Sequence, residues 1–207
     1  MNTIEAITEI LKREGVKYLP CFPTTPVIEA AALGGIRPIV CRQERVGVGI
    51  ADGLSRVSNG DHMGVFAMQY GPGAENAYPG IATSYSDSVP VLLLPLGHPR
   101  ERAGINPHYS SLKGYDDITK AIEQVNVADR TSDVMRRAFA GLRQGRGGPM
   151  AVEIPADVAL EDVSEESFYY VPSLNLSTTF PVGRQSPKAT QETLRLLPRP
   201  SAPPTTR

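Results

Sequence analysis

The sequence predicts an α/β fold, a doubly wound and mostly parallel sheet with helices on both faces. Short apolar runs of strand length alternate with helical patterns along most of the chain, which is typical of strand–helix–strand units. The strand-sized runs are nearly continuous in apolar residues, as from 89 to 96, which indicates burial on both faces of the sheet. Glycine- and proline-containing turns separate the runs.

The first half of the chain provides the clearest helix and strand signals. Ile4, Ile7, Ile10 and Leu11 share one face of a helix that Asn2 or Thr3 caps. The expected elements are this helix, ending at Gly15, a strand over 18–22, a helix ending at Gly34-Gly35, a strand over 38–42 and a helix over 44–58.

The second half continues the alternation around one irregular stretch. Residues 97–117 are rich in glycine, proline and histidine and predict a long surface loop, the kind of segment in which functional residues are common. The other expected elements are a strand over 63–70, a helix over 74–85, a strand over 89–96, a helix-to-strand passage over 118–127, a helix over 132–144 and a strand over 150–154.

The composition is that of an ordinary soluble domain, with 41% hydrophobic and 21% charged residues and a net charge of −1. Without a basic stripe, no nucleic acid partner is expected. We expect no membrane association, because no signal peptide or membrane-length apolar run occurs. Cys21 and Cys41 are expected as reduced, buried thiols, and no metal-ligand spacing is found, so metal ligands are not predicted. The expected location is the cytoplasm.

A change in composition predicts a boundary near residue 162. Residues 1–162 contain the whole strand and helix alternation, so we expect one domain there. Residues 163–207 are predicted to form an extension or linker that is partly disordered and ends in a proline-rich stretch. A short helix is expected at 187–197 within this extension.

An acid and a glycine-rich turn follow two of the predicted strands. Glu44 begins a helix just after the strand over 38–42, and Gly71-Pro72-Gly73 follows the strand over 63–70. In a parallel sheet both positions open at the carboxyl edge, where ligands bind. The glycines allow the backbone to present bare polar groups to a flat ring. We therefore predict a site that combines Glu44 with this turn.

Each of these features also has a purely structural interpretation. A glutamate at a helix start is usually a solvated residue that the helix dipole favours. Gly47, Gly49 and Gly53 have the wrong spacing and position for a dinucleotide fingerprint, which disfavours a nucleotide-binding module and predicts close packing by another backbone or a partner. Most of the acids Asp52, Glu75 and Asp87 are expected as surface charges or caps. The loop histidines His98 and His108 are expected to be incidental rather than catalytic, since neither has a ligand-like companion.

Several motifs in order resemble the N-terminal, pyrimidine-binding domain of thiamine-diphosphate enzymes, in the acetolactate synthase and benzoylformate decarboxylase group. The resemblance covers about 4–158. The matching segments are Cys41-Arg42-Gln43-Glu44-Arg45 with Ala51-Asp52-Gly53-Leu54-Ser55-Arg56, Tyr70-Gly71-Pro72-Gly73-Ala74-Glu75-Asn76, Gly80-Ile81-Ala82 with Asp87-Ser88-Val89-Pro90-Val91, and Gly147-Gly148-Pro149-Met150-Ala151-Val152-Glu153-Ile154-Pro155-Ala156-Asp157-Val158.

The resemblance implies a Rossmann-like thiamine-diphosphate-binding fold and a catalytic role for Glu44. In that family the matched glutamate hydrogen-bonds N1′ of the cofactor's aminopyrimidine, and proton sharing there activates the cofactor for attack on a 2-keto acid. The turn Gly71-Pro72-Gly73 would pack on the pyrimidine ring, and Asn76 would brace the following helix. Thiamine diphosphate is the cofactor that the resemblance implies.

Some positions depart from the family pattern. Gln43 replaces the usual histidine before the glutamate, and Cys21-Phe22-Pro23-Thr24-Thr25 replaces the usual Gly-x-Pro-Gly-Gly turn. The family's Phe-Gln pair has no clean counterpart near His108-Tyr109. The Gly-Asp-Gly segment through which relatives bind Mg²⁺ and the diphosphate is absent from these 207 residues. Mg²⁺ is therefore expected to enter through a domain that this chain lacks.

Two hypotheses remain open at this point. In the first, the chain is the pyrimidine-binding half of a 2-keto acid decarboxylase or acetolactate synthase-like enzyme. It would work as a homodimer or with a partner chain that provides the diphosphate-binding domain, and it would be inactive alone. In the second, it is a truncated, non-catalytic family member that acts only in dimerisation or interaction. The resemblance does not specify the substrate or the exact reaction.

Overall fold

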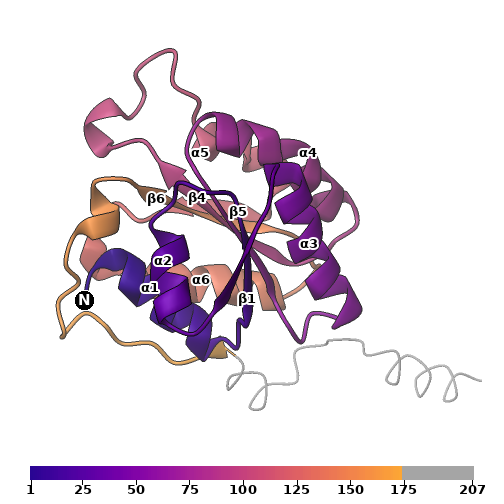
Figure 1. Ribbon diagram of the computed structural model, residues 1–207, viewed down its shortest axis with the longest axis horizontal. Helices are drawn as coiled ribbons and strands as arrows, with labels where there is room; N and C mark the ends of the chain where they lie inside the picture. The colour runs from indigo at the N-terminus through magenta and orange to yellow at the C-terminus, as the bar shows by residue number, and fades with distance from the viewer. Residues whose placement is uncertain (174–207) are drawn as a thin grey trace, which may run out of the picture.

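The computed structural model describes residues 1–173, which form a parallel sheet covered by helices on both faces (Figure 1). The predicted helix at 187–197 and the proline-rich end lie outside the described residues. The six strands have the order β2-β1-β3-β4-β6-β5, and every strand pair is parallel. The predicted fold class is confirmed.

The helices and strands begin and end close to where the sequence places them. In chain order they are α1 (Thr3–Arg13), β1 (Tyr18–Cys21), α2 (Val27–Leu33), β2 (Arg37–Val40), α3 (Glu44–Val57), β3 (Gly64–Met68), α4 (Pro72–Ser86), β4 (Val91–Gly97), α5 (Ser111–Gly114), β5 (Ala121–Gln124), α6 (Thr131–Arg143) and β6 (Met150–Pro155). Short 3-10 turns connect several of them, as at Arg100–Arg102 and Val158–Leu160.

The start of α1 follows the sequence prediction closely. The Asn2 side chain accepts a hydrogen bond from the Glu5 amide, and the Glu5 carboxylate accepts one from the Asn2 amide, which forms a capping box. Ile4, Ile7 and the other apolar residues of this helix are buried against the sheet. The helix period read from the sequence therefore identifies its buried face.

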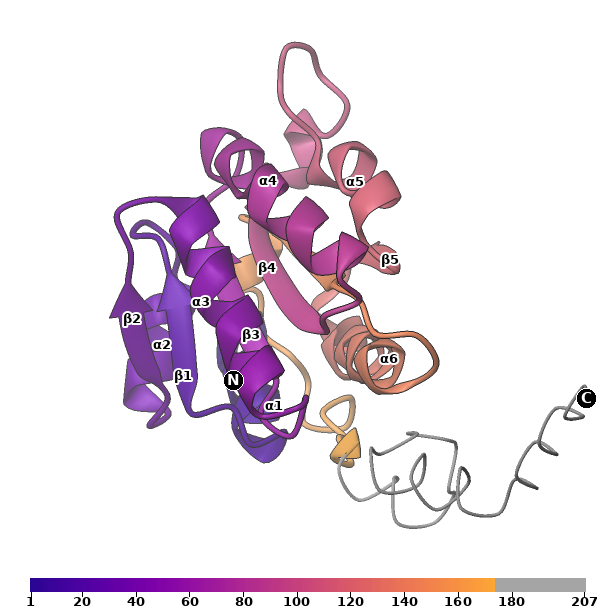
Figure 2. The same ribbon diagram turned by 90° about the vertical axis from the view of Figure 1, so that its right-hand side faces the viewer.

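Two hydrophobic cores lie on opposite faces of the sheet. One joins α1, α2 and α6 to the sheet, and the other lies under α3 and α4 (Figure 2). Consecutive residues of β3 alternate between them, since Val65 packs in the first core and Phe66 in the second. Burial on both faces explains why the strands read as continuous apolar runs.

The long connection between β4 and α5 projects beyond the body of the domain (Figures 1 and 2). It was predicted as one irregular loop, and the structure adds a 3-10 turn at Arg100–Arg102 and the single helical turn of α5. Among residues 1–173, no helix is long and apolar enough to cross a membrane. Cys21 and Cys41 are free and buried, as the sequence predicts.

The residues after 162 remain in contact with the domain as far as they are described. Tyr170 is buried, and its hydroxyl donates a hydrogen bond of 2.6 Å to the Glu14 carboxylate at the end of α1. The Ser173 amide donates to the same carboxylate oxygen. Residues 163–173 thus pack against the domain, and we call this segment the strap. The boundary near residue 162 stays a prediction.

Candidate functional site

The candidate site lies at the carboxyl edge of the sheet, at the point where the order in which successive strands are added to the sheet reverses. After β1 the chain continues to β2 at one end of the sheet, and β3 then lies on the other side of β1. Ligands of doubly wound α/β folds bind at such a reversal. Glu44 begins α3 directly after β2, and Gly71 precedes α4 directly after β3. The sequence prediction placed both at this edge.

Glu44 is buried and has no polar partner. Only 3% of the residue is exposed, and its carboxylate makes no hydrogen bond or ion pair within residues 1–173. A buried carboxylate normally accepts several hydrogen bonds, because an uncompensated charge is costly to remove from water. Glu44 is thus largely enclosed rather than freely solvated, and its carboxylate can accept a hydrogen bond from a ligand. Its role in a site stays a prediction.

The Gly71-Pro72-Gly73 turn lies against this carboxylate. Gly71 has φ +60° and ψ −116°, a backbone conformation that favours glycine, and Pro72 is the first residue of α4. A Cβ atom at Gly73 would lie 3.3 Å from Glu44 Oε1 and 2.6 Å from Gln69 Cγ. The absence of a side chain at Gly73 thus keeps backbone and carboxylate close together.

The turn after β1 reaches the same place. Thr24 Oγ1 donates a hydrogen bond of 2.7 Å to Gln69 Oε1, so the segments that follow β1 and β3 are joined. Thr24 has φ +85°, which is rare for a β-branched residue and costs about 1–3 kcal/mol. Backbone strain of this kind is concentrated at functional sites. The turn where the family usually has glycines keeps a left-handed backbone here with threonine.

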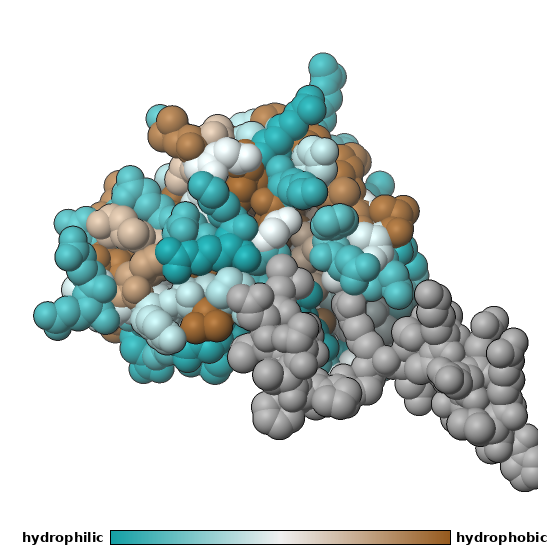
Figure 3. Space-filling model, turned by 90° about the horizontal axis from the view of Figure 1, so that it is seen from below, coloured by the Kyte–Doolittle hydropathy of each residue, from teal (hydrophilic) through white to brown (hydrophobic). Residues whose placement is uncertain are grey.

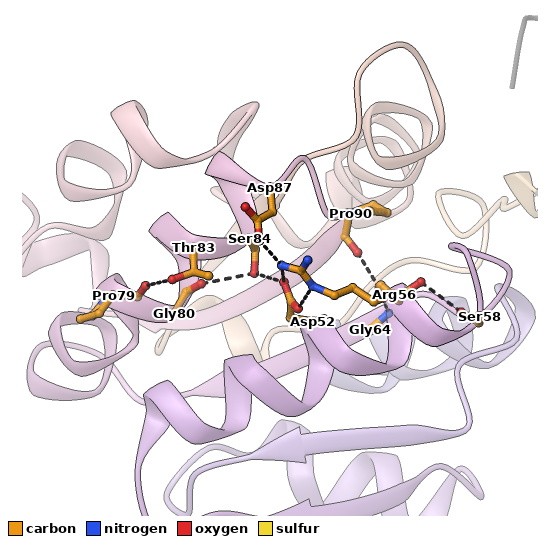
Figure 4. Close-up of polar contacts among 11 residues, drawn as sticks. Asp52, Arg56, Ser58, Gly64, Pro79, Gly80, Thr83, Ser84, Asp87 and Pro90 are labelled. Carbon is orange, nitrogen blue, oxygen red and sulfur yellow. Dashed lines mark hydrogen bonds and ion pairs between the residues drawn. The ribbon is translucent and has the colours of Figure 1, made fainter. Parts of the chain in front are cut away.

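A polar network holds the two helices of the site together (Figure 4). Asp52 of α3 accepts hydrogen bonds from Arg56 and, at 2.7 Å, from the Ser84 hydroxyl of α4. Arg56 also donates to Asp87 at 2.7 Å, and the bonds to Asp52 and then Asp87 raise the pKa of its guanidinium. Asp52 is the exception among the three acids that were mostly expected as surface charges or caps, since its side chain is 13% exposed and connects the helices.

A second set of hydrogen bonds, made by Ser55, holds the C-terminal half of α3 to the sheet. The Ser55 hydroxyl donates to the Pro90 carbonyl at 2.6 Å and accepts from the Gly64 amide at 2.8 Å, which joins α3 to the strand starts on this face (Figure 4). A Cβ atom at Gly80 would lie 2.9 Å from Val48 Cβ, so α4 and α3 pack closely. Together these contacts fix Glu44 relative to the turn.

The three glycines of α3 have two different environments. A Cβ atom at Gly47 would lie 2.1 Å from the Phe66 ring, so this glycine is required by the fold itself. The expected close neighbour is thus a side chain of β3 rather than another backbone. Gly49 and Gly53 have no described atom within 4 Å of a built Cβ. They lie on the outer side of α3 with the exposed Val46 and Val57.

A second set of polar groups at this edge is fully paired. The buried Tyr115 hydroxyl donates to the Ala74 carbonyl at 2.5 Å, and burial raises the pKa of this phenol well above its usual value. Glu153 at the end of β6 accepts hydrogen bonds from the Ser111 hydroxyl and the Gln124 amide. The hydrogen bonds of these groups are therefore made within the chain, and we do not count them among the candidate ligand-binding groups.

Sequence reasoning missed a stack of three rings beside the turn. The Tyr70 and His98 ring centroids are 4.6 Å apart, and those of His98 and His108 are 4.4 Å apart. The two histidines are thus in contact with each other, while the prediction that they are incidental to catalysis stays untested. Their position after β4 and within the irregular loop was the available signal. Pairing them required the loop's conformation, which the sequence pattern does not provide.

Asn76 differs from the other predicted site residues. It lies exposed on α4, and its side chain makes no hydrogen bond within residues 1–173. The bracing contact expected for it is thus not found in the described chain. Its role in cofactor binding stays a prediction.

The fold and site define a class: a doubly wound α/β domain with an unpaired buried acid and a glycine-rich turn at its carboxyl edge. Residues 1–126 match the family described as "Thiamine pyrophosphate enzyme, N-terminal TPP binding domain". The chain belongs to this family, so the resemblance read from its motifs is confirmed.

Curated relatives are acetolactate synthase large subunits. The chain is 32% identical over 173 residues to the probable acetolactate synthase large subunit of Methanocaldococcus jannaschii, covering 81% of this chain and 29% of the relative. It is 31% identical over 174 residues to the isozyme 3 large subunit of Escherichia coli (strain K12), covering 76% and 28%. The chain spans about 30% of the length of these relatives.

Proposed function

We propose that this chain forms the pyrimidine-binding half of a thiamine-diphosphate-dependent enzyme that acts on 2-keto acids, as a decarboxylase or an acetolactate synthase-like enzyme. The observation that supports this most strongly is the buried, unpaired Glu44 carboxylate next to Gly73. Membership of the thiamine pyrophosphate enzyme family supports the choice of cofactor. The relatives' printed names support the reaction class.

The residues at the edge fit an aminopyrimidine ring. Such a ring offers a nitrogen that can share a proton with a carboxylate. The Glu44 carboxylate can accept this hydrogen bond, because it makes no other within residues 1–173. Its flat face needs close approach by backbone, which Gly71 and Gly73 permit because neither bears a side chain. Glu44, Gly71, Pro72 and Gly73 would hold the ring, with Asn76 nearby on α4.

The chemistry that thiamine diphosphate supplies when bound is stabilisation of negative charge at the former keto carbon as carbon dioxide leaves a 2-keto acid. The contribution of this chain is to hold a proton at the Glu44 carboxylate against a ring nitrogen. The small exposure of Glu44 lowers the local dielectric, which strengthens such a hydrogen bond. The network of Asp52, Arg56 and Ser84 keeps α3 and α4 in position for this contact.

We further propose that the outer side of α3 and α4 binds a partner, either a second copy or a chain with the diphosphate-binding domain and its Mg²⁺. Val46 and Val57 of α3 are 50% and 87% exposed. Gly49 and Gly53 leave open space on the same helix. Apolar surface with small residues is typical of interfaces.

This surface also supports the second candidate, a non-catalytic chain that only dimerises or interacts. The two candidates differ in what they require of Glu44. Association through α3 and α4 does not involve the buried carboxylate, whereas catalysis does. The unpaired carboxylate of Glu44 favours the enzyme proposal, because an unpaired, largely enclosed acid adds no stability to a purely structural protein.

A reconstitution experiment tests the proposal. The full chain is mixed with a diphosphate-domain partner chain, Mg²⁺ and thiamine diphosphate, and carbon dioxide release from pyruvate is measured. We expect Glu44→Gln to lower the rate by about 100-fold or more, the range for loss of a positioned acid–base group. Glu75→Gln, an exposed acid in the first turn of α4, is the matched control and should keep full activity. Full activity of Glu44→Gln would exclude Glu44 from the mechanism.

A further inference from the structure

The stack of Tyr70, His98 and His108 lies at the same sheet edge as the proposed cofactor site. Tyr70 directly precedes Gly71 of the turn, and His98 follows the end of β4, the strand next to β3. The rings are tilted by 44° and 39° to their neighbours, with His98 in the middle. The stack is therefore built from three separate segments that the fold brings together.

The polar atoms of this stack make no hydrogen bonds within residues 1–173, in contrast to the hydrogen-bonded Glu153 nearby. Neither imidazole makes a side-chain hydrogen bond within residues 1–173, and neither does the Tyr70 hydroxyl. His98 Nε2 is buried without a partner. The nearby buried carboxylate of Glu153 is satisfied by Ser111 and Gln124. Because an unpaired buried polar atom costs about 1–3 kcal/mol, such atoms are usually completed by a ligand or water.

The groups left open around His98 are hydrogen-bond donors. Burial, and then His108 and Arg102, lower the pKa of His98, while Glu153 opposes them, so the ring is favoured in its neutral form with one N–H donor. The Glu153 carboxylate is already hydrogen-bonded. What remains open around His98 is therefore a set of ring N–H groups and the Tyr70 hydroxyl, with the Arg102 guanidinium acting on the same ring, and such donors bind a carboxylate.

We propose that Tyr70, His98 and His108 form the binding site for the carboxylate of the 2-keto acid substrate, with His98 as the central hydrogen-bond donor. This inference rests on the proposed function, which assigns a 2-keto acid to this edge of the sheet. It concerns residues that differ from the family pattern, since serine is usual at the position of Tyr70 and the family's Phe-Gln pair has no clean counterpart in this loop. His98 thereby becomes a residue that determines substrate specificity.

The chain has three histidines, so their ring signals can be followed individually. The full chain is labelled with ¹⁵N-histidine, and the ring nitrogens are recorded by NMR during titration with sodium pyruvate at constant ionic strength. We expect the His98 and His108 signals to shift saturably. The exposed His62, in the turn before β3, should not move and serves as the internal control. Methyl pyruvate, which lacks the carboxylate charge, should leave all three signals in place.

Two substitutions separate binding from packing. His98→Phe keeps a ring between Tyr70 and His108 but removes both nitrogens, and we expect it to weaken pyruvate binding about tenfold, as loss of one hydrogen bond to a charged group does. His98→Asn breaks the stack but keeps a donor, and we expect it to retain more affinity than His98→Phe. Equal shifts of all three histidines, or unchanged affinity in His98→Phe, would overturn the proposal.

Failure of this proposal and failure of the proposed function give different results. Binding of thiamine diphosphate that depends on Glu44, together with no pyruvate shift at His98, would reject the carboxylate site and leave the cofactor site intact. A pyruvate shift at His98 in a chain whose Glu44→Gln variant reconstitutes full activity would reject the cofactor role of Glu44 instead.

Discussion

Two buried glutamates of this domain differ in how they are satisfied. Glu14 at the end of α1 is 2% exposed, and its carboxylate accepts hydrogen bonds from Tyr170, from both the amide and hydroxyl of Ser173, and from Arg143. Glu44 at the start of α3 is 3% exposed and accepts none within residues 1–173. Burial alone therefore does not distinguish a structural acid from a functional one.

The hydrogen-bond partners of the two carboxylates, rather than their burial, distinguish Glu14 from Glu44. Every bond at Glu14 joins α1 to α6 or to the strap over 163–173, so its charge stabilises the fold. The Glu44 carboxylate makes no such bond within residues 1–173, and the glycine-rich turn lies against it. An acid whose removal costs the fold nothing, at a sheet edge where ligands bind, is best explained by a ligand. The following predictions test this contrast.

The largest expected effect on stability is at Glu14. Glu14→Gln removes the charge opposite Arg143, whose side chain is only 12% exposed, and should lower the free energy of unfolding by about 3 kcal/mol. Glu44→Gln removes no hydrogen bond and takes away an unpaired, largely enclosed charge, so it should not lower the free energy of unfolding. Urea unfolding followed by circular dichroism measures both. Equal losses in the two variants would remove the contrast.

The next effect is at the turn. Gly73→Ala places a Cβ atom 2.6 Å from Gln69 Cγ and 3.3 Å from Glu44 Oε1, so the turn must move. We expect a loss of about 1–3 kcal/mol in the free energy of unfolding and a loss of cofactor affinity. Thermal unfolding with and without thiamine diphosphate measures both quantities. A variant that unfolds and binds like the original chain would contradict the close packing of turn and acid.

A smaller effect of opposite sign is expected on the outer side of α3. Gly49→Ala adds a Cβ atom that meets no described atom and should stabilise the isolated chain by about 1 kcal/mol, because alanine favours helix over glycine. If a partner packs on α3, the same substitution should weaken assembly with it. Sedimentation of the mixed chains measures this. Unchanged assembly would exclude Gly49 from the interface.

The smallest expected effect is the pH dependence at the ring stack. Burial, then His108 and Arg102, lower the pKa of His98 below its usual value of 6.5, while Glu153 opposes the shift. Between these two pKa values the unfolded chain binds more protons, so stability is lost as the pH falls below about 6.5. His98→Phe should reduce this loss between pH 7 and pH 5 in urea unfolding. An unchanged pH profile would show that His98 titrates normally.

Much of the fold and half of the site could be predicted from the sequence. Buried strands and amphipathic helices have local periods, so their type and approximate ends follow from the order of residues. The meeting of Glu44 and Gly71-Pro72-Gly73 was also predictable, because carboxyl ends of parallel strands share one edge. The prediction needed no knowledge of side-chain contacts.

The remaining features depend on contacts between distant segments. Glu14 pairs with Tyr170 and Ser173, far along the chain, and no local pattern indicates that pairing. The His98 and His108 stack requires the path of an irregular loop. Asp52 was interpreted as a surface charge because its partner Ser84 lies on another helix. Long-range polar contacts have no period in sequence, so pattern analysis does not detect them.

The most direct measurement follows the N1′ nitrogen of ¹⁵N-labelled thiamine diphosphate by NMR in the presence of the full chain. If Glu44 shares a proton with this nitrogen, its signal should shift saturably with the original chain, shift equally with Glu14→Gln under conditions where that variant is folded, and stay at its free position with Glu44→Gln. An N1′ shift of the same size with Glu44→Gln would contradict the assignment of the buried acid to the cofactor.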